Sequence, residues 1–195
     1  IDAVERDRPM VVFADYDVDG ASSAAQLVRW MRAMGKDLPI YVPDRITEGY
    51  GPSPAAFRRL REEGAELVVT VDCGAAAYDA IATAAEIGLE VVVIDHHLMR
   101  DGEMPAASAL VNPNRPDDTS GQGRLAAAGV TFVLLAALNR EARRRGMFQD
   151  RPEPDLKQWL DLAAMGAICD VTELCGFNRA LATLRAALPE ESREL

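Results

Sequence analysis

The chain has 195 residues, of which 49% are hydrophobic and 27% charged, and its 31 acidic against 21 basic residues give a formal net charge of −10. These proportions are those of a globular protein that buries a core, so they exclude a fibrous or disordered chain. No apolar run approaches the roughly 20 residues of a membrane-spanning helix, and the acidity by itself argues against nucleic acid as a partner, because phosphate backbones are usually bound by basic surfaces.

In the first half of the chain, short apolar runs that predict strands alternate with stretches that predict helices. The strands are apolar throughout instead of alternating with polar residues, which is typical of strands buried on both faces of a parallel sheet. In chain order we expect a strand at 10–14, a helix at 21–34, a strand at 40–42, a helix at 55–63, a strand at 67–71, a helix at 76–87, and strands at 91–94 and 109–111.

The second half of the chain is helical. Residues 112–124 are rich in Pro, Asp and Gly and predict a loop, and helices are expected at 126–145, 156–168 and 178–188. We therefore predict an α/β fold with a mostly parallel β-sheet and helices on both faces, followed by a helical C-terminal part. It would form one domain over 1–195, with the sheet core at 1–111, the loop at 112–124 and the helical part at 125–195.

Acidic residues recur in this chain directly after apolar runs, and three of these runs are predicted strands. Because the carboxyl ends of parallel strands lie along one edge of a sheet, where ligands bind, we expect these acidic residues to share one cleft. Both of the chain's histidines belong to one of the clusters. The clusters are Asp15, Asp17 and Asp19 after the first strand, Asp72 after the third, Asp95 with His96 and His97 after the fourth, and Asp170 after an apolar helix end.

So many carboxylates in one cleft would repel one another unless cations were present. Aspartate and histidine without a thiolate pattern favour divalent ions such as Mn²⁺ or Mg²⁺. A single aspartate after a strand is often only a helix cap or a turn residue. Four clusters at one edge make coincidence a poor explanation. The three cysteines have no Cys-x-x-Cys spacing, which favours a reducing compartment, so we expect a cytoplasmic protein.

The first acidic cluster also matches the start of two other motifs. Its D-x-D-x-D-G pattern begins an EF-hand calcium loop, but that loop needs a glutamate at its twelfth position and a preceding helix. Here the twelfth position is Gln26 and a strand precedes the loop, so the EF-hand is excluded. Residues 17–20 (DVDG) resemble the start of haloacid-dehalogenase-type phosphatases, which have Thr where this chain has Ala21, and this stays a weaker alternative.

Several segments of the chain, taken in order, resemble the motifs of the DHH phosphoesterase superfamily, and within it those of the RecJ-type single-strand-specific exonucleases. Asp95-His96-His97 is the motif that names the superfamily. Phe13 stands where other branches of the superfamily place a histidine ligand, which favours the RecJ-type branch. The other matching segments are 15–20 (DYDVDG), 71–74 (VDCG) and 166–171 (GAICDV), with 43–45, 48–51, 112–114 and 176–179 as signatures outside the metal site.

The resemblance implies two bound Mn²⁺ or Mg²⁺ ions and a role for each acidic cluster. Asp72 would bridge the ions. His97 would contact the scissile phosphate or assist proton transfer, and Asp95 would orient a ligand histidine. The other metal ligands would be Asp15 and Asp17 on one ion, and Asp19, His96 and Asp170 on the other.

Four further residues are candidates for binding the substrate. Arg45 lies in a loop after a strand and is the best candidate for a phosphate contact. Asn112, Asn114 and Arg179 belong to the matching segments, but they could equally be structural, because such Asn-Pro and Gly-x-Asn sequences commonly form turns.

The resemblance implies a metal-dependent 5′-to-3′ exonuclease that acts on single-stranded DNA in repair and recombination, as a monomer, with a single-strand-binding protein as a possible partner. One alternative is a hydrolase of short RNAs or small phosphorylated nucleotides. Another is an inactive domain that binds replication partners. The superfamily pairs this domain with a C-terminal domain that nothing here resembles, so we expect full binding of single-stranded DNA to need that additional region.

Overall fold

The computed structural model describes residues 1–100 and 103–187 of the chain. Its centre is a five-stranded sheet with the strand order β2-β1-β3-β4-β5, in which all neighbouring strands run parallel. This confirms the predicted fold class. The strands are β1 (Met10–Ala14), β2 (Ile40–Tyr41), β3 (Leu67–Val71), β4 (Glu90–Ile94) and β5 (Ala109–Val111).

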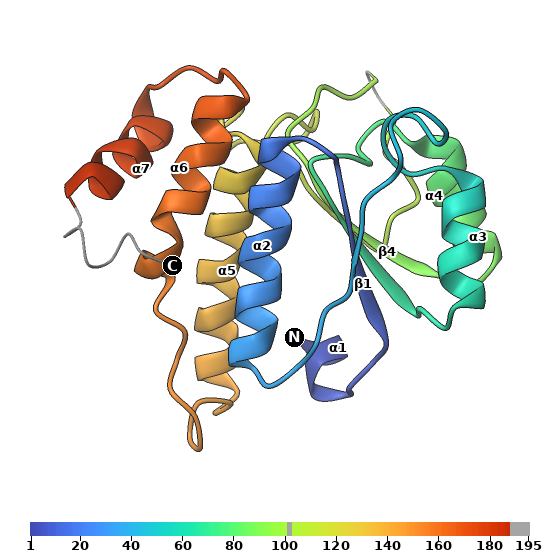
Figure 1. Cartoon of the computed structure of the whole chain (residues 1–195), viewed down its shortest axis with the longest axis horizontal. Coiled ribbons are helices and arrows are strands. Elements are labelled where there is room, and N and C mark those ends of the chain that lie inside the picture. Colours follow the sequence, from blue (N-terminus) through green and yellow to red (C-terminus); the bar gives the residue numbers. More distant parts are fainter. Residues whose placement is uncertain (101–102, 188–195) are drawn as a thin grey trace.

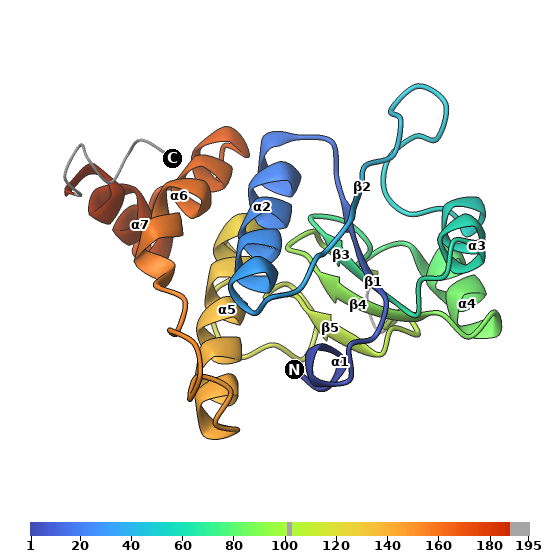
Figure 2. The same ribbon diagram turned by 60° about the horizontal axis from the view of Figure 1, so that its bottom comes forward.

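Helices cover both faces of the sheet, as Figures 1 and 2 show. Helices α2 (Val18–Ala33) and α5 (Ala127–Arg144) lie on one face, and α3 (Pro54–Glu62) and α4 (Tyr78–Glu86) lie on the other. The remaining helices are α1 (Asp2–Glu5), the 3₁₀ turn η1 (Leu156–Trp159), α6 (Leu160–Cys169) and α7 (Gly176–Ala187). In the described part of the chain, no helix is long and apolar enough to cross a membrane.

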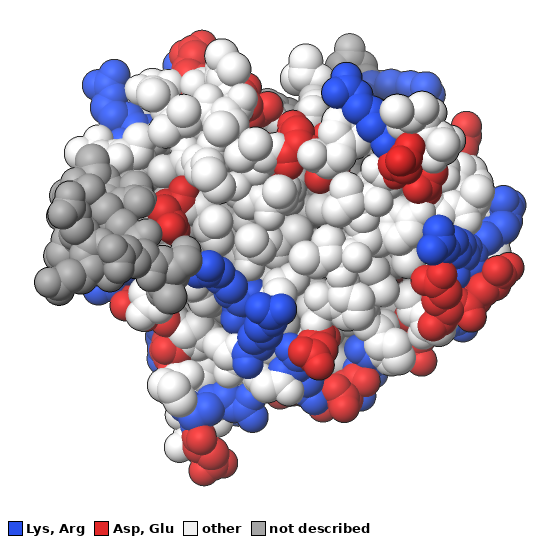
Figure 3. Space-filling view, viewed as in Figure 1, with Lys and Arg blue, Asp and Glu red and all other residues white. Residues whose placement is uncertain are grey.

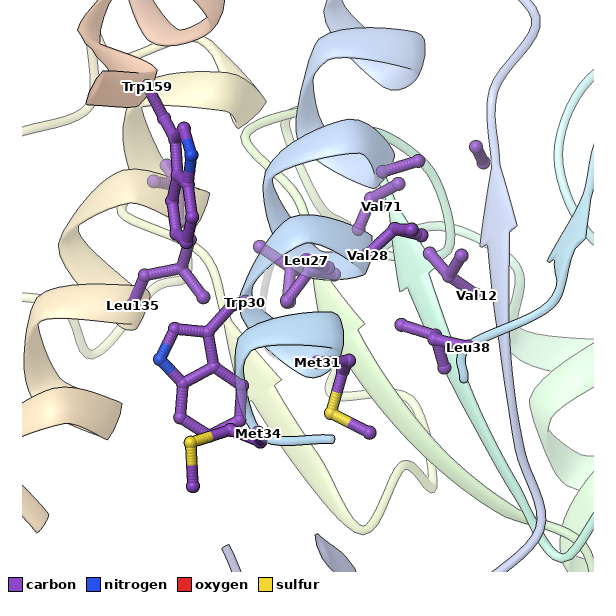
Figure 4. Close-up of a cluster of buried hydrophobic side chains, with 14 of the residues drawn as sticks. Val12, Leu27, Val28, Trp30, Met31, Met34, Leu38, Val71, Leu135 and Trp159 are labelled. Atoms are coloured by element: carbon purple, nitrogen blue, oxygen red, sulfur yellow. The ribbon is translucent and has the colours of Figure 1, made fainter. Parts of the chain in front are cut away.

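The larger hydrophobic core lies between the sheet and helices α2 and α5. Figure 4 shows Val28 on the side of α2 that faces the sheet and Trp30 on the side toward α5. Trp30 is fully buried, and its indole N–H donates a 2.8 Å hydrogen bond to Asn139 on α5. Because a buried indole needs an acceptor, this bond fixes the two helices against each other.

Helix α2 begins at Val18, three residues before the predicted start. The reason is a cap: the side chain of Asp17 accepts a 2.9 Å hydrogen bond from the backbone N–H of Gly20, which satisfies one of the free amides of the first turn. Asp19 therefore lies inside the helix and not in a loop. Two further differences are the short helix α1, which was not predicted, and the 3₁₀ turn at the start of the predicted helix 156–168. The expected end of the last helix, residue 188, lies outside the described residues.

Candidate metal centre

The carboxyl ends of three neighbouring strands place three aspartates side by side. Ala14 of β1 is in register with Val71 of β3, which is in register with Ile94 of β4. The next residue on each strand is an aspartate, namely Asp15, Asp72 and Asp95. All three are buried. Figure 3 shows acidic side chains along the upper edge of the molecule, between the helical half and the sheet half.

The side chains at this edge form three overlapping groups, in each of which the potential ligand atoms lie within 4.8 Å of one another. Asp72 and His96 each belong to two of the groups, and Oδ1 of Asp72 lies 3.3 Å from Nε2 of His96. Asp72 thus lies between the other candidate ligands, where a bridging residue would be expected. The groups are Asp15, Asp17 and Asp72; Asp19, His96 and Asp170; and Asp72, His96 and His97.

Three of these ligand atoms are buried without a hydrogen-bond partner in the described structure: Oδ1 of Asp15, Oδ1 of Asp72 and Nε2 of His96. Leaving such a group unpaired costs about 1–3 kcal/mol, and more when it is charged. Carboxylate oxygens and an imidazole nitrogen suit Mn²⁺ and Mg²⁺. The residues present therefore fit divalent cations, which would satisfy all three atoms.

Burial and mutual repulsion make these carboxylates hard to ionise without a cation. Burial, followed by the nearby carboxylates of Asp19 and Asp17, raises the pKa of Asp72 to about 10. Burial also raises the pKa of Asp19 to about 6, although two backbone amides and His96 oppose the shift. A bound cation favours the ionised carboxylates, so metal binding and loss of protons from this cluster are coupled.

Asp19 is held by the beginning of helix α5. Its two carboxylate oxygens accept hydrogen bonds from the backbone N–H groups of Ala127 (2.6 Å) and Ala128 (2.8 Å). The first amides of a helix have no partner within the helix and favour a negative charge. On the other side, Gly166 of α6 lies so close to Asp19 that a Cβ atom there would collide with Oδ1. The three helices α2, α5 and α6 thus fix this carboxylate.

Asp170 comes from the helical half of the chain, at the C-terminal end of α6. Its Oδ2 atom lies 3.7 Å from Nε2 of His96. Helix α6 packs closely on α2 and α5, and this packing carries Asp170 to the edge of the sheet. The candidate metal centre is therefore assembled from both halves of the chain.

Asp95 orients His97, whereas the resemblance led us to expect that it would orient a ligand histidine. Its Oδ1 atom lies 2.7 Å from Nδ1 of His97 and accepts hydrogen bonds from the backbone N–H groups of both histidines. Its Oδ2 atom accepts a 2.8 Å bond from the N–H of Ala75. Burial raises the pKa of Asp95, but the bonds from His97 and the amides outweigh burial and lower it overall. In turn, the bond to Asp95 raises the pKa of His97.

Tyr50 is a site residue to which the sequence interpretation gave no role. Its hydroxyl donates a 3.1 Å hydrogen bond to the backbone carbonyl of Asp72 and lies 3.3 Å from Nδ1 of His97. Burial raises the pKa of Tyr50, so the phenol keeps its proton. The only signal in the sequence was its position within the matching segment 48–51.

Arg45 lies at the rim of the centre. Its guanidinium group stacks over the ring of Tyr16, 5.2 Å from the ring centroid, and Tyr16 directly follows Asp15. The side chain is exposed and makes no ion pair within the described structure. Such a guanidinium is available for a phosphate.

Asn112 and Asn114 are engaged within the protein. The Asn112 amide donates to the carbonyl of His97 (2.9 Å), and the Asn114 amide donates to the carbonyls of His96 (2.5 Å) and Gly123 (2.9 Å). These bonds support a positioning role for both asparagines, which the sequence left open, and their expected contact with substrate is still a prediction.

Arg179 lies on α7, where its Nε–H donates to the carbonyl of Leu174 at 3.1 Å. Within the described chain, no hydrogen bond or ion pair joins Arg179 to the acidic cluster. Its expected contact with substrate is still a prediction.

Replacing Asp95 by asparagine is expected to lower the pKa of His97 toward its ordinary value of 6.5, because the negative charge that stabilises the imidazolium is removed. In the unmodified protein the raised pKa means that this pairing stabilises the fold fully below pH 6.5, and that the contribution is lost as the pH rises through the folded pKa. An NMR titration of the metal-free protein measures this directly, because the chain has only two histidines. A His96→Gln variant assigns the resonances, and an unchanged pKa of His97 in the Asp95 variant would contradict the pairing.

The family model for the DHH family, N-terminal domain, matches residues 9–167 of the chain. A single-stranded-DNA-specific exonuclease RecJ from Dickeya dadantii is 42% identical over 183 residues. This match covers 92% of the chain but 31% of the relative. The chain thus spans about a third of the length of this curated relative.

Two solved structures resemble the chain along nearly its whole length. A crystal structure of exonuclease RecJ bound to manganese superimposes with a TM-score of 0.81 and 34% identity, covering 98% of the chain and 46% of that protein. A crystal structure of RecJ from Thermus thermophilus in complex with Mn²⁺ gives a TM-score of 0.71 at 34% identity, covering 94% of the chain and 24% of that protein. Both relatives hold Mn²⁺, an ion that the donor set of this chain also fits.

Proposed function

Since the chain belongs to the DHH family, we propose that it hydrolyses the phosphodiester bonds of single-stranded DNA from the 5′ end, with two Mn²⁺ or Mg²⁺ ions as cofactors. The observation that carries this proposal is the meeting of six candidate ligands with three unpaired ligand atoms at one sheet edge. The identity to RecJ relatives supports single-stranded DNA as the substrate. The expected setting is DNA repair and recombination.

The residues of the chain would hold the ions in two positions built from the three overlapping groups. Asp15 and Asp17 would bind one ion, Asp19, His96 and Asp170 would bind the other, and Asp72 would contact both. When bound, two such ions activate water and stabilise the charges on the attacking and leaving oxygens of a phosphate. The protein's own part is to hold these ligands in place, which burial and the amides of α5 accomplish.

His97 is the residue placed to move a proton. Because Asp95 engages its Nδ1 atom, the Nε2 atom, which lies 3.4 Å from the hydroxyl of Tyr50, is the ring nitrogen that would contact the scissile phosphate or give a proton to the leaving oxygen. A raised pKa favours the protonated, donating form of this imidazole. Tyr50 contacts both the ring of His97 and the backbone of Asp72, so it holds the proton donor and the central carboxylate at a fixed separation.

A cavity of about 530 Å³ beside His97 offers room for the terminal nucleotide. This is within the usual range for a small-molecule site. Its wall includes Tyr50, Pro52 and Leu98, which suits the apolar faces of a nucleotide. Outside this cavity, Arg45 over Tyr16 would bind a phosphate. The net charge of −10 is consistent with this substrate, because five of the acids belong to the ligand groups whose charge the cations offset.

A comparison of substrates tests the proposal. A preparation that contains residues 1–195 should release mononucleotides from a long 5′-phosphorylated single strand in Mn²⁺, more slowly from the duplex, and not in excess EDTA. Faster turnover of a dinucleotide than of the long strand would instead favour the hydrolase of short RNAs or small nucleotides. Absence of Mn²⁺ binding in calorimetry would favour a partner-binding domain without activity. Light scattering would test the expected monomer, and a pull-down would test the single-strand-binding protein.

A further inference from the structure

The three members of one candidate ligand group, Asp19, His96 and Asp170, lie on separate parts of the chain. Asp19 is on α2, His96 follows β4 and Asp170 ends α6. The structure nevertheless connects each of these residues, or a residue close to it in the chain, by hydrogen bonds to one short segment. This segment, residues 123–128, joins the loop after β5 to the beginning of α5.

The connection to His96 runs through Asn114. One amide nitrogen, Nδ2, donates both to the carbonyl of His96 at 2.5 Å and to the carbonyl of Gly123 at 2.9 Å. Asn112 supports this link, because its Oδ1 accepts a 2.7 Å bond from the N–H of Asn114 while its own amide holds the carbonyl of His97. The histidine loop is thereby fixed to the start of the 123–128 segment.

The connection to Asp170 runs through Asn178 of α7, which is 1% exposed. Its Nδ2 atom donates to the carbonyl of Arg124 (2.7 Å) and to the carbonyl of Glu173 (3.1 Å) and the hydroxyl of Thr172 (3.1 Å). Thr172 in turn donates a 2.8 Å bond to the carbonyl of Ala167 in α6. The loop that begins with Asp170 is thus held to the carbonyl next to the one that Asn114 engages.

The connection to Asp19 is direct, through the backbone N–H groups of Ala127 and Ala128. We propose that residues 123–128 are the common reference that sets the separation of Asp19, His96 and Asp170, and that Asn114 and Asn178 are positioning residues for this metal position. They would act through the backbone carbonyls that they hold. The inference rests on the proposed metal centre. It adds the segment that holds three ligands from distant parts of the chain at fixed positions relative to one another.

Asn139 provides a matched control for the two asparagines. Like Asn178 it is buried, at 5% exposed, and like both asparagines it bridges two segments, by accepting from Trp30 and donating to the carbonyl of Pro154 at 2.9 Å. None of its partners is a candidate metal ligand or a neighbour of one. Trp30 lies about three helical turns along α2 from Asp19, so the removal of Asn139 reports the stability cost of losing a buried asparagine that holds no part of the ligand loops.

The test measures the Mn²⁺ affinity of the 195-residue chain by calorimetry, together with urea unfolding of each protein. Asn114→Ala and Asn178→Ala should each weaken Mn²⁺ binding about tenfold, as expected for residues that position metal ligands without binding the metal themselves. Asn139→Ala should lower stability yet leave the affinity of the folded protein unchanged. If an alanine variant does not fold, the corresponding serine variant is measured, and the same loss of affinity is expected.

A double variant distinguishes a shared reference from two independent supports. Because breaking either link frees His96 relative to Asp170, Asn114→Ala combined with Asn178→Ala should bind Mn²⁺ about as weakly as the weaker single variant. A loss equal to the product of the two single losses would overturn the shared segment. Wild-type affinity in either single variant, or an equal loss in Asn139→Ala, would overturn the positioning role. Failure of the unmodified chain to bind Mn²⁺ would instead refute the metal centre itself.

Discussion

An Asp72→Asn variant is expected to lose Mn²⁺ binding, because Asp72 would contact both ions. Its rate of DNA hydrolysis should be lower than that of the unmodified protein by about a thousandfold or more. Asp72 shares a candidate ligand group with Asp15 and Asp17, and its Oδ1 atom lies 3.3 Å from Nε2 of His96, so its loss would affect both proposed metal positions. Metal ions supply several kcal/mol of transition-state stabilisation, and each 1.4 kcal/mol, roughly, corresponds to a factor of ten in rate. The measurements are Mn²⁺ calorimetry and the release of mononucleotides from single-stranded DNA.

Asparagine is the right replacement at this position for a backbone reason. Asp72 has a φ of +60°, the left-handed region that asparagine tolerates better than most residues and in which alanine would be strained. The substitution therefore removes the charge and keeps the backbone. Because the buried carboxylate is itself costly without a cation, the variant should be at least as stable as the unmodified protein when both are free of metal.

This stability difference separates a ligand from a residue that merely supports the fold. Mn²⁺ should raise the unfolding temperature of the unmodified protein, since it binds only the folded state, and should raise that of the variant much less. Asp37→Asn is a suitable control, because Asp37 is exposed and belongs to no candidate ligand group. If Asp72→Asn kept its Mn²⁺ affinity and near-unmodified rates, the assignment of the centre would be wrong.

The parallel sheet could be predicted from the sequence because its strands are apolar on both faces. The strands at Met10–Ala14, Leu67–Val71 and Ala109–Val111 have the predicted bounds, since a polar residue directly follows the apolar run of each. The same logic brought the aspartates together, because residues that directly follow strands in register must be neighbours. Periodicity and strand ends are local properties, and the sequence displays them.

What could not be predicted depends on contacts between distant backbones. The partner of Asp95 is one example: His96 and His97 follow it directly, and only the turn after β4 decides that the ring of His97 donates to Asp95. The amides of Ala127 and Ala128 are another example, because nothing in the sequence indicates that the backbone of these two alanines binds Asp19. Asn114 shows the same limitation, because the sequence predicts an asparagine in a turn but does not show whether its side chain also holds the carbonyl of a histidine.

Gly20 illustrates how the structure changes the meaning of a motif residue. In the sequence it closes a D-x-D-x-D-G pattern, which suggests a turn that needs glycine's freedom. In the structure it lies inside α2 and is absent from the residues with positive φ. A Cβ atom on Gly20 would lie 2.5 Å from the carbonyl oxygen and 2.9 Å from the amide nitrogen of Asp15. The glycine is therefore required by the close approach of the helix to the end of β1.

Gly20→Ala is accordingly expected to destabilise the protein by about 2 kcal/mol. Overpacking costs about 1–3 kcal/mol, and the upper end applies because the atoms met are backbone atoms that cannot rotate away. Alanine in place of glycine within a helix gains about 1 kcal/mol, which offsets only part of this cost. The same collision displaces Asp15, so Mn²⁺ affinity should fall as well. Urea unfolding and calorimetry measure the two effects.

Gly129→Ala is the matched control, because Gly129 is also a buried glycine inside a helix. Its nearest neighbour would be the Cδ2 atom of Leu125 at 3.2 Å, the end of a side chain that can move by a few tenths of an ångström. The helix-forming gain of alanine, about 1 kcal/mol, should then balance or exceed the cost, so that stability stays the same or rises. If Gly20→Ala behaved like Gly129→Ala, with unchanged stability and Mn²⁺ affinity, the approach of α2 to Asp15 would not be what demands glycine. If Gly20→Ala alone is destabilised and binds Mn²⁺ weakly, the motif's glycine acts by placing a metal ligand.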